Sequence, residues 1–126
     1  MKKLFALRGA VQTLNNAADI RVQVAALYRE LLHANNLAES DIVSLVFSVT
    51  PDLTAQNPCA ALRQEGYAEN LALFAVQEAA TDGMMNHVIR ILIHCYMEEN
   101  ASPAHAYMNG AEKLRPDRKL PKGSAD

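Results

Sequence analysis

The sequence predicts an α+β domain in which one long amphipathic helix and short helices pack on a β-sheet. Short apolar or alternating runs bounded by turn residues, which are typical of strands, occur before and after the one long segment with helical periodicity, residues 17–35. The chain has 126 residues, of which 50% are hydrophobic and 21% are charged. That length and composition are typical of one globular domain with a core of its own.

Five segments are predicted to be strands. Residues 3–12 and 88–97 alternate between two sets of side chains, as residues on the two faces of a strand do. Residues 41–49 and 71–77 are apolar at most positions, which indicates strands that are buried on both faces. Residues 111–114 are predicted to form a last short strand.

Three segments are predicted to be helices. The long one covers residues 17–35 and follows Asn15-Asn16, which can cap it. A proline in the first turn predicts a short helix over residues 59–64. Ser102-Pro103 resembles a helix start and predicts another short helix through Tyr107. The apolar residues of the long helix recur at helical spacing: Ile20, Val24, Leu27, Leu31 and Ala34.

The apolar strands also bear on the assembly of the protein. One long helix and two short ones cannot cover both faces of so apolar a sheet, and uncovered apolar surface favours association. We therefore expect a homo-oligomer in which a partner subunit covers the remaining face.

Charge and hydropathy argue against two classes of partner. The chain has 12 Lys and Arg against 14 Asp and Glu, a formal net charge of -2, and it has no basic run before its tail, so we expect no nucleic-acid partner. No segment reaches the roughly 18 apolar residues that a membrane-spanning helix needs. The apolar run after Lys2-Lys3 ends at Arg8, too early for a secretion signal. A cytoplasmic protein without a membrane partner is expected.

The two cysteines lack the spacing of a metal site or a redox motif, so reduced thiols are the default expectation. Cys95 alternates with core residues and is interpreted as part of the packing. Cys59 follows Pro58 at a predicted helix start, where a thiolate could be stabilised. No histidine lies near Cys59 in the sequence, and we do not assign it as a nucleophile.

Two charged side chains interrupt the apolar strands. Arg90 shares one face of its strand with Val88 and Leu92, and Glu78 ends the preceding strand. Because an unpaired buried charge is strongly unfavourable, Arg90 must meet either a carboxylate of the protein or an anion from outside. The pattern alone leaves open a plain salt bridge to Glu78 and an anion-binding site.

A second arginine, Arg8, lies on a predicted strand face with Leu4 and Ala6. The next residue, Gly9, lets a backbone segment or a ligand approach closely. Taken alone, the pattern around Arg8 favours an edge-strand arginine that points into water over a ligand-binding one.

Five short motifs occur in an order and spacing that resemble an AroH-type chorismate mutase over nearly the whole chain. Each motif alone is weak, but the ordered set is specific. They are Arg8-Gly9-Ala10, Ser48-Val49-Thr50-Pro51-Asp52-Leu53, Val76-Gln77-Glu78, Val88-Ile89-Arg90 and Leu114-Arg115-Pro116-Asp117.

The resemblance implies a mixed β-sheet and a homotrimer whose subunits together form a pseudo-α/β barrel, with active sites at the subunit interfaces. Residues 1–114 would form the chorismate mutase-like domain and residues 115–126 a mobile charged tail. The implied reaction is the Claisen rearrangement of chorismate to prephenate, on the route to phenylalanine and tyrosine. It requires no cofactor and no metal.

The resemblance also implies roles for individual residues. Arg90 would meet the ether oxygen and the enolpyruvyl carboxylate of chorismate, Arg8 would lie near that carboxylate, and Glu78 would bind the ring hydroxyl. The other positions implied to line or flank the site are Arg63, Phe74, Ala75, Val76, Gln77, Tyr107 and Arg115. Because Arg115 and Lys119 are cationic and lie beside a site for an anion, we also expect these tail residues to order over the bound dianion.

Two positions depart from the family pattern. Ala75 stands where a cysteine can contact the ring hydroxyl, and Asn57 stands where an aromatic residue can wall the pocket. Neither replaced group is needed for a proton transfer, so we expect a changed affinity and the same reaction. The alternative function is a non-catalytic carboxylate-binding or regulatory trimer, which would keep Arg8 and Arg90 but would not need Glu78.

Overall fold

The computed structural model describes residues 1–115, so the predicted tail lies outside the described residues except for Arg115. Residues 1–115 form five strands, two α-helices and two short 3₁₀ helices. In chain order these are β1 (Lys2–Gln12), α1 (Ala17–Ala34), η1 (Glu39–Asp41), β2 (Ile42–Val49), α2 (Pro58–Gln64), β3 (Ala72–Gln77), β4 (Val88–Glu98), β5 (Ala106–Met108) and η2 (Ala111–Leu114).

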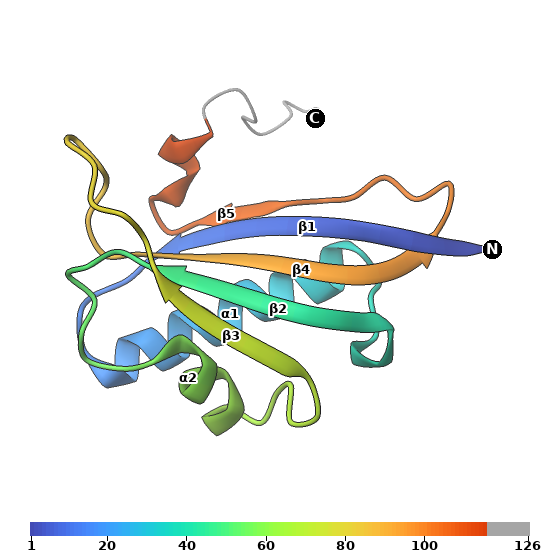
Figure 1. Cartoon of the computed structure of the whole chain (residues 1–126), viewed down its shortest axis with the longest axis horizontal. Coiled ribbons are helices and arrows are strands. Elements are labelled where there is room, and N and C mark those ends of the chain that lie inside the picture. The colour runs from blue at the N-terminus through green and yellow to red at the C-terminus, as the bar shows by residue number, and fades with distance from the viewer. Residues whose placement is uncertain (116–126) are drawn as a thin grey trace.

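The five strands form one mixed sheet in the order β3-β2-β4-β1-β5 (Figure 1). The central strand β4 is antiparallel to both neighbours, β1 and β2. The outer strands β3 and β5 run parallel to β2 and β1 respectively. The mixed sheet and the α+β class are therefore confirmed.

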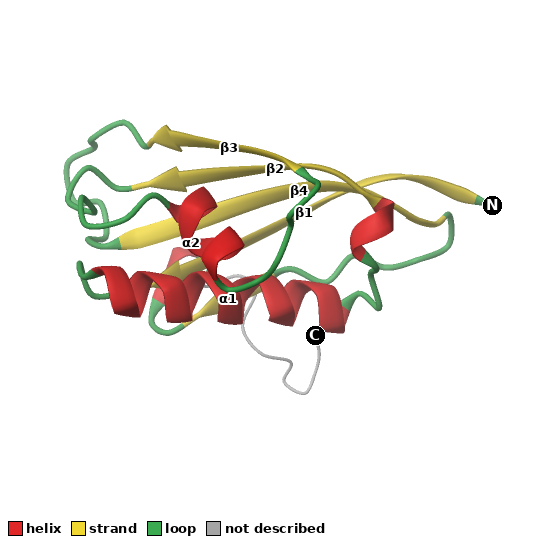
Figure 2. Cartoon of the chain, turned by 90° about the horizontal axis from the view of Figure 1, so that it is seen from below, coloured by secondary structure: helices red, strands yellow, loops and turns green. Residues whose placement is uncertain are grey.

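Both α-helices lie on the same side of the sheet (Figure 2). The strict alternation of β4 turns Ile89, Ile91, Ile93, Cys95 and Met97 toward these helices, and all five side chains are buried. They pack with residues of α1 such as Val24 and Leu27 in one continuous core. Within residues 1–115, no helix is long and apolar enough to cross a membrane.

The predicted long helix is confirmed as α1, and its cap is Asn16. The Asn16 side chain accepts a hydrogen bond from the backbone N–H of Asp19 at 2.7 Å. Asn15 has another role: its side-chain oxygen accepts from the N–H groups of Thr54 and Ala55, both at 3.0 Å. Asn15 thus ties the start of α1 to the loop after β2.

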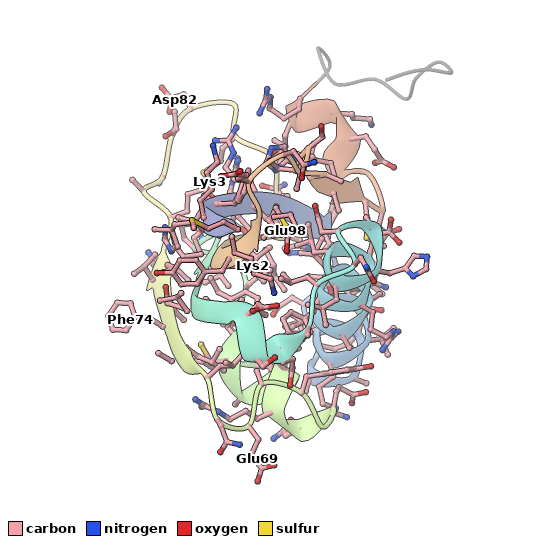
Figure 3. The ribbon with its side chains drawn as sticks, turned by 90° about the vertical axis from the view of Figure 1, so that its right-hand side faces the viewer. Lys2, Lys3, Glu69, Phe74, Asp82 and Glu98 are labelled. Atoms are coloured by element: carbon pink, nitrogen blue, oxygen red, sulfur yellow. The ribbon has the colours of Figure 1, made fainter. Side chains whose placement is uncertain are left out.

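The other side of the sheet, called the open face below, has no α-helix over it in the described chain. It carries Leu4, Phe74, Val76 and Tyr96 as exposed apolar side chains, and Phe74, at 65% exposure, projects away from the molecule (Figure 3). The prediction that residues 41–49 and 71–77 are buried on both faces is wrong for the single chain, since Val43, Phe74 and Val76 are exposed. β3 is an edge strand, and only its other face is covered by α2.

Two predictions near the C-terminus are also wrong. The segment predicted as a helix through Tyr107 forms β5 instead, where Tyr107 pairs with Ala10 and satisfies the outer edge of β1. Asn35 holds the chain that leads into it, through two 2.8 Å hydrogen bonds with the backbone of Ala104. Residues 111–114 form the 3₁₀ helix η2, which follows Gly110 in the left-handed conformation (φ 101°).

Three strand ends meet at Thr50, Asp52 and His87. The Thr50 hydroxyl donates to the Asp52 carboxylate at 2.6 Å and accepts from the N–H of Val88 at 3.0 Å. The N–H of His87 donates to both Asp52 oxygens at 3.2 Å, and the carbonyl of His87 accepts from the N–H of Thr13 at 3.0 Å. This network joins the ends of β1 and β2 to the start of β4.

The same contacts determine the ionisation of Asp52. Partial burial alone would raise its pKa, but the hydrogen bonds from Thr50 and His87 and the nearby His87 imidazole together lower the pKa of Asp52 below its ordinary value. The folded state therefore favours the carboxylate form.

Gly9 lies where two elements crowd β1. A methyl group at this position would lie 2.8 Å from the carbonyl oxygen of Ala106 and 3.1 Å from side-chain carbons of Leu27 and Leu31. The glycine thus permits the close approach of β5 on one side and α1 on the other. The sequence left open whether Gly9 admits a backbone segment or a ligand. The close backbone of β5 accounts for the glycine.

We predict that Gly9→Ala destabilises the fold by about 1–3 kcal/mol, because the added methyl overpacks a site bounded by backbone and core side chains. Urea unfolding of the purified variant measures the loss. A free energy of unfolding equal to that of the wild type would show that β5 and α1 yield without cost.

We also predict that acid destabilises the protein partly through Asp52. Because the pKa of Asp52 is lower in the folded state, its contribution is complete above the unfolded value of about 4 and is lost as the pH falls further. Urea unfolding at several pH values measures the free energy of unfolding. As the pH falls below about 4, this free energy should decrease less for Asp52→Asn than for the wild type. Equal losses would contradict this assignment.

Candidate active site

The open face is hollowed by a cavity of about 220 Å³ that contains residues from four strands. Its lining includes three predicted site residues, Arg8, Arg90 and Tyr107, which lie far apart in the sequence. The remaining lining residues are Gly9, Val46, Ser48, Ile91 and Leu92. The structure therefore brings together two arginines and a phenol on a largely apolar wall.

The strand register explains why these side chains meet. Arg90 on β4 stands opposite Ala10 on β1 and Ser48 on β2, and Ala10 in turn stands opposite Tyr107 on β5. Directly paired residues point to the same face of a sheet, so Arg90 and Tyr107 share the open face. Arg8, two residues before Ala10, points to that face as well.

Arg90 forms an ion pair with Glu78. Its Nε donates to Oε1 of Glu78 at 3.0 Å, with 41% of the Arg90 side chain and 25% of the Glu78 side chain exposed. The backbone N–H of Glu78 donates to the carbonyl of Val49 at 2.8 Å, which ties this residue to the end of β2. The salt bridge, one of the two alternatives that the sequence left open, is present, and it leaves Arg90 accessible at the cavity.

The backbone of Arg8 is fixed by a residue that the sequence analysis did not assign. The N–H of Arg8 donates to Nδ1 of His105 at 3.0 Å, so this nitrogen carries no proton and the neutral imidazole has its proton on Nε2. His105 directly precedes β5. It lies one residue before Ala106, which pairs with Gly9, the residue after Arg8. A side-chain bond of this kind leaves no periodic signal in the sequence.

A second set of predicted residues lies elsewhere in the chain. Ala75 and Val76 line another cavity, of about 300 Å³, together with Asn57 and Pro58 at the start of α2. Asn57 caps α2, since its side-chain oxygen accepts from the N–H of Cys59 at 2.8 Å. The position that departs from the family's aromatic residue thus has a local structural role.

The remaining predicted residues are exposed or lie at the edges of the two cavities. Arg63 projects from α2 and Phe74 from the open face, and Gln77 ends β3; all three are exposed, and none lines either cavity. Arg115 follows η2, whose Leu114 packs in a small cluster with Tyr107. The start of the tail is therefore close to the cavity wall.

Neither cysteine has the environment of a nucleophile. Burial raises the pKa of the Cys59 thiol, and the nearby charge of Arg63 offsets this only in part, so the helix start does not stabilise a Cys59 thiolate. Burial also raises the pKa of Cys95, whose side chain is fully enclosed in the core. Its interpretation as a packing residue is confirmed.

Comparisons with other proteins point to one family. The sequence matches the profile of a family described as chorismate mutase type I over residues 4–118, a range that includes all five motifs. Chorismate mutase AroH of Thermus thermophilus is 29% identical over 114 residues, which cover 88% of this chain and 93% of that protein. Chorismate mutase AroH of Bacillus subtilis is 25% identical over 120 residues, with 94% of each chain covered.

The fold agrees with these sequence matches. A solved structure of a chorismate mutase from Clostridium thermocellum is similar to this chain with a TM-score of 0.79 and 33% sequence identity. The similarity covers 87% of this chain and 99% of that one. Sequence and architecture therefore agree over nearly the full length of both proteins.

Proposed function

Because the chain belongs to the chorismate mutase type I family and is a chorismate mutase, an isomerase of aromatic amino-acid biosynthesis, we propose that Arg90, Arg8 and Glu78 carry out the conversion of chorismate to prephenate. The observation that carries this proposal is the open-face cavity, where Arg8 and Arg90 converge and Glu78 pairs with Arg90. A site for a dicarboxylate needs such a pair of cations.

The chemistry of the rearrangement matches what these residues offer. Within one molecule, a C–O bond breaks while a C–C bond forms, so no nucleophile, general base, metal or redox cofactor takes part. The substrate must be folded into its reactive diaxial shape, and the ether oxygen must be stabilised as it becomes electron-rich. Two arginines held by β-strands can bind the carboxylates and meet this oxygen together.

In this mechanism Arg90 is an electrostatic catalyst. Its fixed charge interacts most strongly with the charge that develops on the ether oxygen in the transition state, which lowers the barrier more than it strengthens ground-state binding. The Glu78 carboxylate accepts a hydrogen bond from the ring hydroxyl of the substrate and keeps Arg90 oriented before the substrate arrives. Tyr107 and the backbone of residues 74–77 provide walls of the pocket.

The assembly we propose is a homotrimer with a pseudo-α/β barrel and active sites at its interfaces. Two observations support it: the open face exposes apolar side chains, and Arg63 and Asn57 lie away from the Arg8–Arg90 cavity of their own chain. In a trimer, a partner subunit would cover the open face and supply the second set of residues to the cavity. The site would then be complete only in the assembly.

Two further parts of the proposal concern the tail and the location of the enzyme. Arg115 follows η2 near Tyr107, so a cationic tail could close over the bound dianion. Lys119, the other tail residue expected to take part, lies outside the described residues. We place the enzyme in the cytoplasm, consistent with its two free cysteines.

We predict that Arg90→Lys lowers kcat by about a hundred- to thousandfold, since a lysine lacks the planar fork that serves carboxylate and ether oxygen together. KM should rise far less. Steady-state consumption of chorismate, followed by absorbance, measures both constants. Arg63→Ala is the comparison variant and should mainly raise KM. A near-wild-type kcat for Arg90→Lys would remove Arg90 from this role.

We predict a trimer in sedimentation at micromolar concentration, which Phe74→Glu disrupts because an interface does not tolerate an unpaired buried carboxylate. Val22→Glu is the matched control, since Val22 is an exposed apolar residue of α1 on the opposite side of the sheet. A monomeric wild type, or equal disruption by both variants, would contradict an interface at the open face.

A further inference from the structure

The segment from Val49 to Asp52 holds both ends of the loop that separates Glu78 from Arg90. At the first end, the N–H of Glu78 donates to the carbonyl of Val49 at 2.8 Å. At the second end, the N–H of His87 donates to both carboxylate oxygens of Asp52 at 3.2 Å. Glu78 and Arg90 thus form an ion pair across a loop whose two ends are both bound to the same short segment, residues 49–52.

Thr50 connects these contacts to β4. Its side chain is 2% exposed, and its hydroxyl accepts from the N–H of Val88 while donating to Asp52 at 2.6 Å. Its backbone N–H donates to the carbonyl of Val88 at 3.1 Å. Thr50 therefore binds both the N–H and the carbonyl of Val88. Val88 lies two residues before Arg90 and on the same face of β4.

These contacts surround a residue with an uncommon backbone conformation. His87 has φ 56°, in the left-handed region that a residue other than glycine seldom occupies. Its N–H is held by Asp52 and its carbonyl by Thr13. Loss of the Asp52 or Thr50 contacts would let His87 relax and would shift the start of β4.

We propose that Thr50 and Asp52 are positioning residues of the enzyme. They fix the start of β4 against the segment whose Val49 carbonyl accepts from the N–H of Glu78, and so set the geometry of the Arg90–Glu78 pair. This inference rests on the role proposed above for Arg90, and it assigns no contact with the substrate to either residue.

Electrostatic catalysis makes this positioning matter. A charge stabilises the transition state only from the correct place, and a misplacement of about 1 Å can cost roughly a hundredfold in rate. Ground-state binding depends less on it, because Arg8 and other cationic residues also hold the dianion. A smaller displacement of Arg90 should therefore lower kcat and leave KM nearly unchanged.

The test compares Thr50→Val with Thr50→Ser. Valine keeps the shape of threonine but removes the hydroxyl that joins Val88 to Asp52, whereas serine keeps the hydroxyl. We expect Thr50→Val to lower kcat about tenfold with KM within about twofold of the wild type, and Thr50→Ser to restore most of kcat.

Tyr28→Phe separates positioning from a general loss of stability. The buried Tyr28 hydroxyl donates to Glu39 at 2.7 Å. Glu39 lies in η1, directly before β2, whereas Thr50 directly follows that strand. Its removal costs a comparable buried hydrogen bond and should leave kcat unchanged. An equal fall in kcat for Tyr28→Phe and Thr50→Val, or no fall for Thr50→Val, would overturn the proposal.

A double-mutant cycle shows whether Thr50 acts through Arg90. In an Arg90→Ala background, Thr50→Val should lower the residual kcat by less than about twofold, since the group that it positions is absent. A tenfold fall in both backgrounds would overturn the proposal. A wild-type kcat for Arg90→Ala alone would instead refute the assignment of Arg90, which keeps the two failures distinguishable.

Discussion

The register of β4 is the constraint on which both the core and the site depend. Its two-residue alternation points Ile89 and Ile91 toward the helices and places Arg90 on the open face, between Ala10 and Ser48. A shift of one residue would expose the isoleucines and bury the guanidinium in the core. The interactions that stabilise the fold therefore also fix the position of the Arg90 charge.

The surroundings of Arg90 leave room for a substrate and keep the charge oriented. The residues paired with Arg90 on the neighbouring strands, Ala10 and Ser48, are small. They leave space for the cavity that larger side chains such as Tyr107 line. A half-exposed ion pair such as Arg90–Glu78 contributes only about 0–1 kcal/mol to stability. Its main effect is on orientation, together with the backbone anchors at Val49 and Asp52. A fixed, accessible guanidinium is what electrostatic catalysis of a unimolecular rearrangement requires.

Elements with strong periodicity could be predicted from the sequence, and the rest depended on tertiary contacts. The alternation of residues 88–97 predicted the face of Arg90, and its ion pair with Glu78 was one of two alternatives that the pattern left open. β5 and η2 are too short to show a period, and the outer edge of β1 decides the conformation of residues 106–108. The proximity of Arg8 to Tyr107 depends on strand register and could not be seen in either segment. Side-chain bonds to backbone, such as those of Thr50 and His105, leave no sequence pattern. The reaction came from the ordered motifs, which the family match then confirmed.

The most direct test of this account is the consumption of chorismate by the purified protein, followed by absorbance, beside Arg90→Ala. We predict turnover to prephenate by the wild type and its loss in the variant, with chorismate also raising the thermal unfolding temperature of the wild type. Turnover by Arg90→Ala at the wild-type rate would contradict the central role of this charge. Thermal protection of the wild type without turnover would instead describe a carboxylate-binding trimer.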